Sequence, residues 1–241
     1  MITELTFSRE YGSFWRAITP TSEAFVRQVN LGLSERWYRP LAGETASARR
    51  AFVNELGFCL FRELAGGVWR GREWVRPSDR DAVVQAAVGE AWRRVGSLAK
   101  RAGGDRLGVE DGELREAMSL AGRLQAYFRE AQDLVIEPTF AGCGVVDECR
   151  GDLLADSTLT EIKAGERPFR SVDIRQILTY LALNHAAPEP KGILEVCLLN
   201  PRLGLAFKTT VQDLCFNVSG LETRQLLDSV SFETSRSDVS R

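Results

Sequence analysis

The pattern of hydrophobic and polar residues changes from helical to extended near residue 133. Before that point, apolar residues recur every three or four positions, which is the spacing of amphipathic helices. The clearest expected helices cover residues 46–64, 79–101 and 113–133. We therefore expect residues 1–110 to form a mainly helical N-terminal region, which is either a separate subdomain or an elaboration of the domain that follows.

After residue 133 the pattern indicates short strands. The segments expected to be extended are residues 134–140, 144–146, 152–155, 158–163, 192–199 and 205–210. Asp156-Ser157 is a tight-turn sequence, and it predicts a hairpin between the third and fourth of these segments. Ser171 is expected to cap a helix over residues 172–185, and a last helix is expected near residues 221–227.

The resulting order of helix, strands, helix, strand and strand predicts an α/β domain with a mixed sheet over residues 111–228. Residues 229–241 are polar and rich in serine, and we expect them to form a disordered tail.

Composition narrows the chemistry that this chain can carry out. Its 241 residues have a net charge of −2, a single histidine and five cysteines. One histidine excludes His-rich metal sites, and the scattered cysteines disfavour disulfide frameworks, zinc sites and iron–sulfur clusters. No P-loop and no GxSxG motif is found in the sequence. No apolar stretch is long enough to span a membrane, so we expect a cytoplasmic protein whose chemistry depends on carboxylates.

The candidate chemistry is concentrated between residues 152 and 163. Glu161 and Lys163 are two positions apart, so on a strand they project from the same face. Asp152 lies on the neighbouring strand of the expected hairpin, within reach of that face. Two adjacent carboxylates repel each other unless a cation lies between them, and Mg²⁺ commonly binds one or two carboxylates together with waters and phosphate oxygens. Asp152 and Glu161 are therefore predicted metal ligands, and Lys163 is placed to act on a water or on developing negative charge.

These residues match a known family pattern. Gly151-Asp152 is followed by Glu161-Ile162-Lys163, and Gln176 and Tyr180 lie one helical turn apart in the next helix. Over roughly residues 134–210 the chain resembles the PD-(D/E)XK, or restriction-endonuclease-like, nuclease superfamily, with glycine in place of the proline before the aspartate.

The resemblance implies an αβββαβ core and a Mg²⁺-dependent nuclease, with Mn²⁺ as a substitute ion, that hydrolyses phosphodiester bonds of DNA. It makes Asp152 and Glu161 metal ligands, together with the carbonyl of Ile162. Lys163 would act on the attacking water and Gln176 would help position the site. Antiviral defence against phage, or restriction, is the setting that the family suggests, with partner subunits or a homo-oligomer.

Several alternatives remain open at this stage. Asp147 is a rival to Asp152 as the first ligand, and Glu55, Glu116 or Glu130 is a candidate for the upstream glutamate that some family members use. Glu161 and Lys163 alone would also fit an ordinary ion pair on an exposed strand. The arginines that follow Lys163, at positions 167, 170 and 175, either contact phosphates or form a solvated surface.

The function has alternatives as well. One is a catalytically inactive nuclease-fold subunit that binds nucleic acid or assists assembly, and another is a nuclease for RNA or for structured junctions. A net charge of −2 favours a protein that reaches its nucleic acid with the help of a partner.

Overall fold

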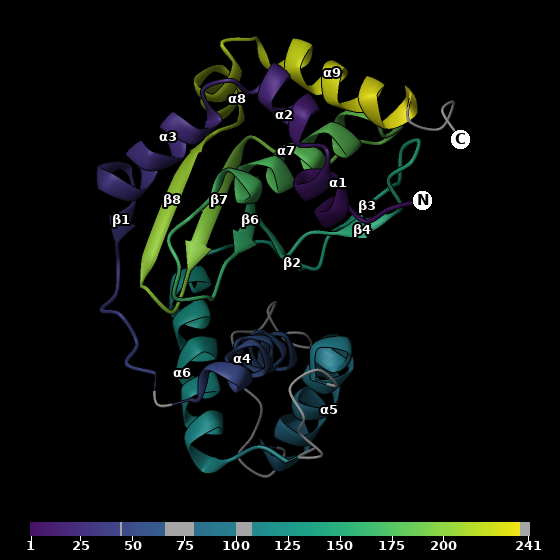
Figure 1. Cartoon of the computed structure of the whole chain (residues 1–241). Coiled ribbons are helices and arrows are strands. Elements are labelled where there is room, and N and C mark those ends of the chain that lie inside the picture. The colour runs from purple at the N-terminus through teal and green to yellow at the C-terminus, as the bar shows by residue number, and fades with distance from the viewer. Residues whose placement is uncertain (44, 66–79, 100–107, 237–241) are drawn as a thin grey trace.

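The computed structural model describes residues 1–43, 45–65, 80–99 and 108–236, and it shows a mixed β-sheet with helices packed on both faces (Figure 1). The helices on one side of the sheet are α1 (Glu4–Glu10), α2 (Gly12–Ile18), α3 (Ser22–Gln28), α7 (Ser171–Ala186), α8 (Val211–Ser219) and α9 (Thr223–Arg236). Those on the other side are α4 (Arg50–Ala65), α5 (Arg80–Ala99) and α6 (Asp111–Phe128). Two short helical turns, η1 (Val29–Leu33) and η2 (Ser47–Arg49), lie between these elements.

The main sheet has six strands in the order β1-β8-β7-β6-β5-β2. They are β1 (Glu35–Arg36), β2 (Leu134–Ile136), β5 (Leu153–Ala155), β6 (Thr158–Ile162), β7 (Glu195–Asn200) and β8 (Leu205–Thr210). Strands β6 and β7 are parallel, because the connecting helix α7 brings the chain back to the end of the sheet at which β6 begins. Every other pair of neighbouring strands is antiparallel. Strands β3 (Thr139–Phe140) and β4 (Cys149–Arg150) form a separate two-stranded ribbon.

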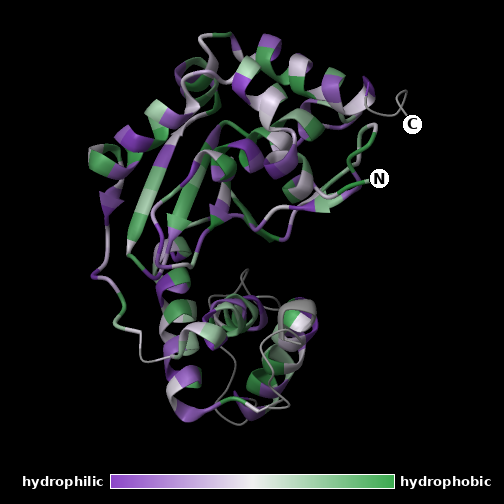
Figure 2. Cartoon of the chain, in the orientation of Figure 1, coloured by the Kyte–Doolittle hydropathy of each residue, from purple (hydrophilic) through white to green (hydrophobic). Residues whose placement is uncertain are grey.

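Alternation along the strands supplies the two cores. In β7, Val196 and Leu198 enter the core under α7, whereas Cys197 and Leu199 enter the core against α4 and α6. Figure 2 shows the central strands β7 and β8 as largely hydrophobic, and the outer helix α9 as alternating between hydrophobic and hydrophilic residues. A sheet that is covered on both faces explains why its central strands are apolar runs.

The helices before residue 111 contribute to both cores. Phe7, Trp15 and Phe25 from α1–α3 are buried in the core that contains α7, and Phe52 and Leu56 from α4 are buried in the opposite core. Strand β1 extends the sheet by pairing with β8. This N-terminal region is therefore packed against the same sheet as the rest of the chain.

The α/β class and the mixed sheet agree with the sequence analysis, and several boundaries differ from it. Helix α6 ends at Phe128 rather than at residue 133. Residues 144–146, expected to be extended, form a tight turn closed by a bridge between Cys143 and Val146. Ser171 is the first residue of α7 and not its cap: the N-cap is Arg170, whose main-chain N–H donates to Oδ2 of Asp173, the third residue of the helix, at 2.9 Å.

The C-terminal part is more ordered than its polar composition suggests. The sequence predicts one short helix near residues 221–227, but the structure has α8 and α9, and α9 continues to Arg236. The expectation of a disordered tail is therefore wrong for residues 229–236, because Leu226, Leu227 and Val230 form a buried stripe that fixes the helix against α7 and α8. Residues 237–241 lie outside the described part of the chain. Within the described ranges, no helix is long and apolar enough to cross a membrane.

Candidate metal-binding and catalytic site

The β5–β6 hairpin brings Asp152 opposite Glu161. Leu153 pairs with Thr160 in the antiparallel register, so the next residue outward on each strand is Asp152 on one and Glu161 on the other. The Oδ2 atom of Asp152 accepts a hydrogen bond from the main-chain N–H of Ile162 at 2.6 Å, which holds the carboxylate against β6. The turn is the expected one: Asp156 adopts a left-handed conformation with φ of 52°.

Glu161 and Lys163 lie on the face of the sheet that α7 covers, and Ile162 faces the other way. Ile162 packs against the core formed with α4 and α6, whereas Leu159, two residues before Glu161, is buried in the core with α7. The Nζ of Lys163 donates to Glu161 Oε1 at 2.6 Å and to Gln176 Oε1 at 2.8 Å. The four residues predicted from the sequence are thus gathered in one place.

Helix α7 supplies the wall of the site. The amide of Gln176 donates to the Tyr180 hydroxyl at 2.9 Å, and that hydroxyl donates to the carbonyl of Arg150 at 3.2 Å. The Tyr180 ring is stacked on Phe140, with centroids 5.2 Å apart. Residues one helical turn apart share a face, so Gln176 and Tyr180 both point toward the hairpin. This chain of contacts fixes the oxygen that accepts from Lys163.

Asp173, one turn before Gln176, is a further acidic residue of the site. Its carboxylate is buried, and its Oδ1 lies 4.0 Å from Lys163 Nζ. The two carboxylate oxygens accept hydrogen bonds from the two terminal nitrogens of Arg167, both at 2.7 Å. Of the other two arginines noted in the sequence, Arg175 lies 3.7 Å from Glu23 and Arg170 is exposed. Arg167 therefore binds Asp173 at the start of α7, and the Arg170 side chain faces solvent.

Burial makes the two hairpin acids costly to ionise. Burial, together with the charge of Glu161, raises the pKa of Asp152 well above its usual range. Burial also raises the pKa of Glu161, although Lys163 opposes the shift. For Lys163, burial favours the neutral amine, but the charges of Glu161 and Asp152 outweigh it and raise the pKa of the ammonium. One cation, Lys163, thus faces two acids that burial makes costly to ionise.

The donor set fits a hard divalent cation. Glu161 is 3% exposed, and its Oε2 has no hydrogen-bond partner among the described residues. A buried carboxylate oxygen without a partner next to a second acid is a place where a cation would be stabilised. Across the part of the chain that the structure describes, no group of three or more His, Cys, Asp or Glu side chains is arranged to hold a metal ion. The ligands expected here are two carboxylates and a carbonyl.

The other acidic candidates lie elsewhere. Asp147 is in the connection between β3 and β4, outside the hairpin that carries Glu161. Glu130 is exposed and pairs with Arg129 at 2.8 Å, and Glu116 is buried in an ion pair with Arg202 at 2.6 Å. Glu55 is the one of the three upstream glutamates whose charge raises the pKa of Asp152, but it also pairs with Arg94 at 3.2 Å.

Glu4, at the start of α1, is an acidic residue near the site that the sequence analysis missed. Its Oε1 accepts from the amide of Gln176 at 3.5 Å, and its charge contributes to the raised pKa of Glu161. Glu4 reaches the site because α1 packs along α7, where the hydroxyl oxygens of Ser8 and Thr179 are 3.4 Å apart. No local motif marks Glu4, because its neighbour in space lies 172 residues away in the sequence.

No protein-family model and no curated protein matches this sequence.

Proposed function

We propose that this protein is a metal-dependent nuclease that hydrolyses phosphodiester bonds, with Asp152, Glu161, Lys163 and Gln176 at its active site. The observation that carries the proposal is the convergence of the buried Glu161 and the half-buried Asp152 on the face where Lys163 Nζ lies 2.6 Å from Glu161 Oε1, together with the unpaired Oε2 of Glu161 among the described residues. An ordinary surface ion pair would need neither the second carboxylate nor the burial.

The order of elements supports the assignment to the PD-(D/E)XK superfamily. Helix α6 is followed by β2, β5 and β6 as an antiparallel set, then by α7, and then by β7 parallel to β6. This is the αβββαβ order that the sequence resemblance implies. The ribbon β3–β4 is an insertion between the first and second strands of that core.

The roles of the residues follow from their positions. A Mg²⁺ ion bound here would activate a water and neutralise charge on the scissile phosphate. Asp152 and Glu161 would hold the ion through oxygens of the same sheet face. Lys163, which the site keeps as an ammonium, would then direct its charge at the phosphate or the attacking water rather than remove a proton. Gln176, which donates to the Tyr180 hydroxyl, would keep that ammonium in place by accepting a hydrogen bond from it.

We propose DNA as the substrate, with RNA as the alternative that the same chemistry allows. The setting that we favour is an effector of phage defence or restriction that acts with partner subunits. A net charge of −2 supports a partner, because nucleic-acid affinity depends largely on cationic contacts to phosphates.

The test is cleavage of labelled DNA and RNA oligonucleotides, single- and double-stranded, in Mg²⁺ or Mn²⁺. We expect Lys163→Ala to lower kcat by about 100-fold or more, the range typical of a group acting on the transition state. Lys208→Ala is the matched control, since Lys208 also pairs with a glutamate, Glu195, at 2.7 Å, but at an exposed position of strand β8. Equal cleavage by wild type and Lys163→Ala would refute the catalytic assignment.

A further inference from the structure

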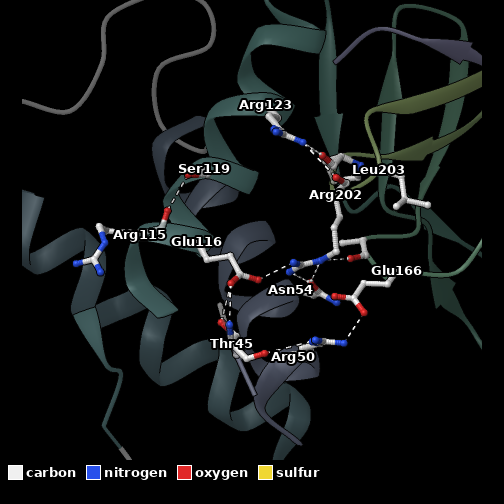
Figure 3. Close-up of polar contacts among 12 residues, drawn as sticks. Thr45, Arg50, Asn54, Arg115, Glu116, Ser119, Arg123, Glu166, Arg202 and Leu203 are labelled. Atoms are coloured by element: carbon white, nitrogen blue, oxygen red, sulfur yellow. Dashed lines mark hydrogen bonds and ion pairs between the residues drawn. The ribbon is translucent and has the colours of Figure 1, made fainter. Parts of the chain in front are cut away.

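A buried arginine contacts the backbone just after Lys163, the residue that follows strand β6. Arg202, in the turn between β7 and β8, is 1% exposed. Its Nε donates to the Ala164 carbonyl at 2.9 Å and to Asn54 Oδ1 at 3.2 Å. Its two terminal nitrogens donate to Glu116 Oε1 and to Asn54 Oδ1, both at 2.6 Å (Figure 3).

The contacts of Arg202 join three elements at one point. Asn54 belongs to α4, Glu116 belongs to α6, and Ala164 is the residue after Lys163. Glu116 is itself held by Thr45, whose hydroxyl donates to Glu116 Oε2 at 2.7 Å. Figure 3 shows Arg202 pointing from the β7–β8 turn toward α4 and α6, with Glu116 and Asn54 on either side of its guanidinium.

The backbone after Lys163 has left the sheet, and these side chains replace its strand partners. The N–H of Lys163 still donates to the Leu199 carbonyl of β7 at 2.8 Å. The next two carbonyls, of Ala164 and Gly165, accept instead from Arg202 and from the Asn200 amide, the latter at 2.9 Å. The peptide on the C-terminal side of Lys163 is therefore fixed by the β7–β8 turn.

Stability alone does not account for an ion pair at this place. Replacing a buried ion pair by well-packed apolar residues is often neutral or stabilising, whereas removing one partner commonly costs about 3–5 kcal/mol. What a guanidinium adds is direction, because its planar fork donates to several acceptors in a defined geometry.

We propose that Arg202, oriented by Glu116, is a positioning residue that fixes the peptide after Lys163 and thereby the location of the Lys163 ammonium in the active site. The inference rests on the proposed nuclease function. Lys163 Nζ lies within 2.6–2.8 Å of its two acceptors, so a small shift of its main chain would move the ammonium out of register with the substrate. A misplacement of about 1 Å typically costs on the order of a hundredfold in rate.

The experiment separates positioning from stability by removing the whole ion pair. Arg202→Met alone leaves Glu116 buried without its cation. The double variant Arg202→Met/Glu116→Gln relieves that charge, while the introduced amide keeps an oxygen that can accept from Thr45. Arg49→Met/Glu113→Gln is the matched control: Arg49 and Glu113 form another mostly buried pair at 2.7 Å near the same two helices, away from Ala164. Each variant is measured for melting temperature, for kcat and KM per folded molecule, and for amide exchange of the peptide that contains residues 163–166.

We expect the Arg202→Met/Glu116→Gln variant to melt close to the control variant, with kcat about ten- to a hundredfold lower, KM within about threefold of wild type and faster exchange of residues 163–166. A double variant with the kcat and local exchange of the control would overturn the proposal. If wild type cleaves none of the substrates in Mg²⁺ or Mn²⁺, the nuclease function fails. The exchange data still decide whether Arg202 fixes the segment: faster exchange in the Arg202 variant alone supports that role, and equal exchange refutes it.

Discussion

Glu161 is the residue at which the site differs most from ordinary packing. It sits on a central strand at 3% exposure, with one oxygen bound to Lys163 and the other without a partner among the described residues. A buried acceptor left without a hydrogen bond costs about 1–3 kcal/mol. Asp152 adds a second charge beside it. In the proposed function a divalent cation would satisfy this arrangement.

A substitution that removes one of these charges should therefore stabilise the metal-free protein. Because the pKa of Asp152 is raised in the folded state, folding favours its protonated form. The stability that this preference contributes is fully present below the unfolded pKa of about 4 and is lost as the pH rises through the folded pKa. At neutral pH without metal, we expect Asp152→Asn to raise the melting temperature by about 2–4 °C, and the difference from wild type to shrink as the pH falls toward about 5.

The same variant should lose its response to metal. Under the proposed function, Mg²⁺ would bind the folded wild type and stabilise it by an amount that grows with the logarithm of [Mg²⁺] above the Kd. The melting temperature should therefore rise with Mg²⁺ for wild type and stay flat for Asp152→Asn. Asp147→Asn is the control, because Asp147 is the rival acid outside the hairpin. A flat response in Asp147→Asn and a normal response in Asp152→Asn would transfer the ligand role to Asp147.

At the scale of elements, α7 is the part of the fold that orients the site. It presents Asp173, Gln176 and Tyr180 on one face, and Tyr180 links Gln176 to the Arg150 carbonyl of β4. The orientation of Gln176 thus depends on a phenol hydroxyl that is anchored on the β3–β4 ribbon rather than on the hairpin.

We expect Tyr180→Phe to lower kcat by about three- to tenfold while costing about 1 kcal/mol of stability, since one hydrogen-bonded hydroxyl is lost and Gln176 is no longer anchored. Tyr127→Phe is a suitable comparison: the hydroxyl of the partly buried Tyr127 also contacts a buried partner, Cys197 Sγ at 3.5 Å, on the opposite face of the sheet. Steady-state kinetics and thermal melts of both variants check this. Equal kcat in Tyr180→Phe and wild type would remove Tyr180 from the positioning of the site.

The elements differ in how far the sequence predicts them. The β5–β6 hairpin is predictable because its signals are local: alternating residues on both sides of Asp156, whose carboxylate also accepts from the N–H groups of Gln132 and Asp133 at 3.1 and 3.0 Å. Helix α9 is not predictable over residues 229–236, because its polar composition conceals a narrow buried stripe. Burial of that stripe depends on how α9 packs against α7 and α8, and no local sequence pattern describes that packing.

At the scale of the molecule, the site is assembled from segments far apart in the chain. Asp152, Glu161 and Lys163 lie within one hairpin, so their convergence can be predicted. The places of Glu4 and of the pair formed by Arg202 and Glu116 cannot, because their contacts depend on how α1 packs on α7 and how α6 meets the β7–β8 turn. From the sequence alone Glu116 is a candidate metal ligand, but in the structure it forms an ion pair with Arg202 instead.

The helices α4–α6 are linked to the backbone on both sides of the hairpin's open end. Arg202, held by α4 and α6, binds the Ala164 carbonyl after Lys163. Arg94 on α5 pairs with Glu137 at 2.6 Å, and the N–H of Glu137 donates to the Asp152 carbonyl at 2.9 Å. The helices on this side of the sheet therefore support the lysine and the first acid through separate contacts.

The proposed function depends most on Asp152 and Glu161 holding a divalent ion together, and Mn²⁺ soaked into crystals of the protein would reveal that ion through its anomalous scattering. We expect an anomalous peak within bonding distance of both carboxylates, at about 2.0–2.3 Å, on the side of the sheet that carries Lys163. A strong peak elsewhere, or none between these two residues in crystals whose site is open to solvent, would contradict this assignment.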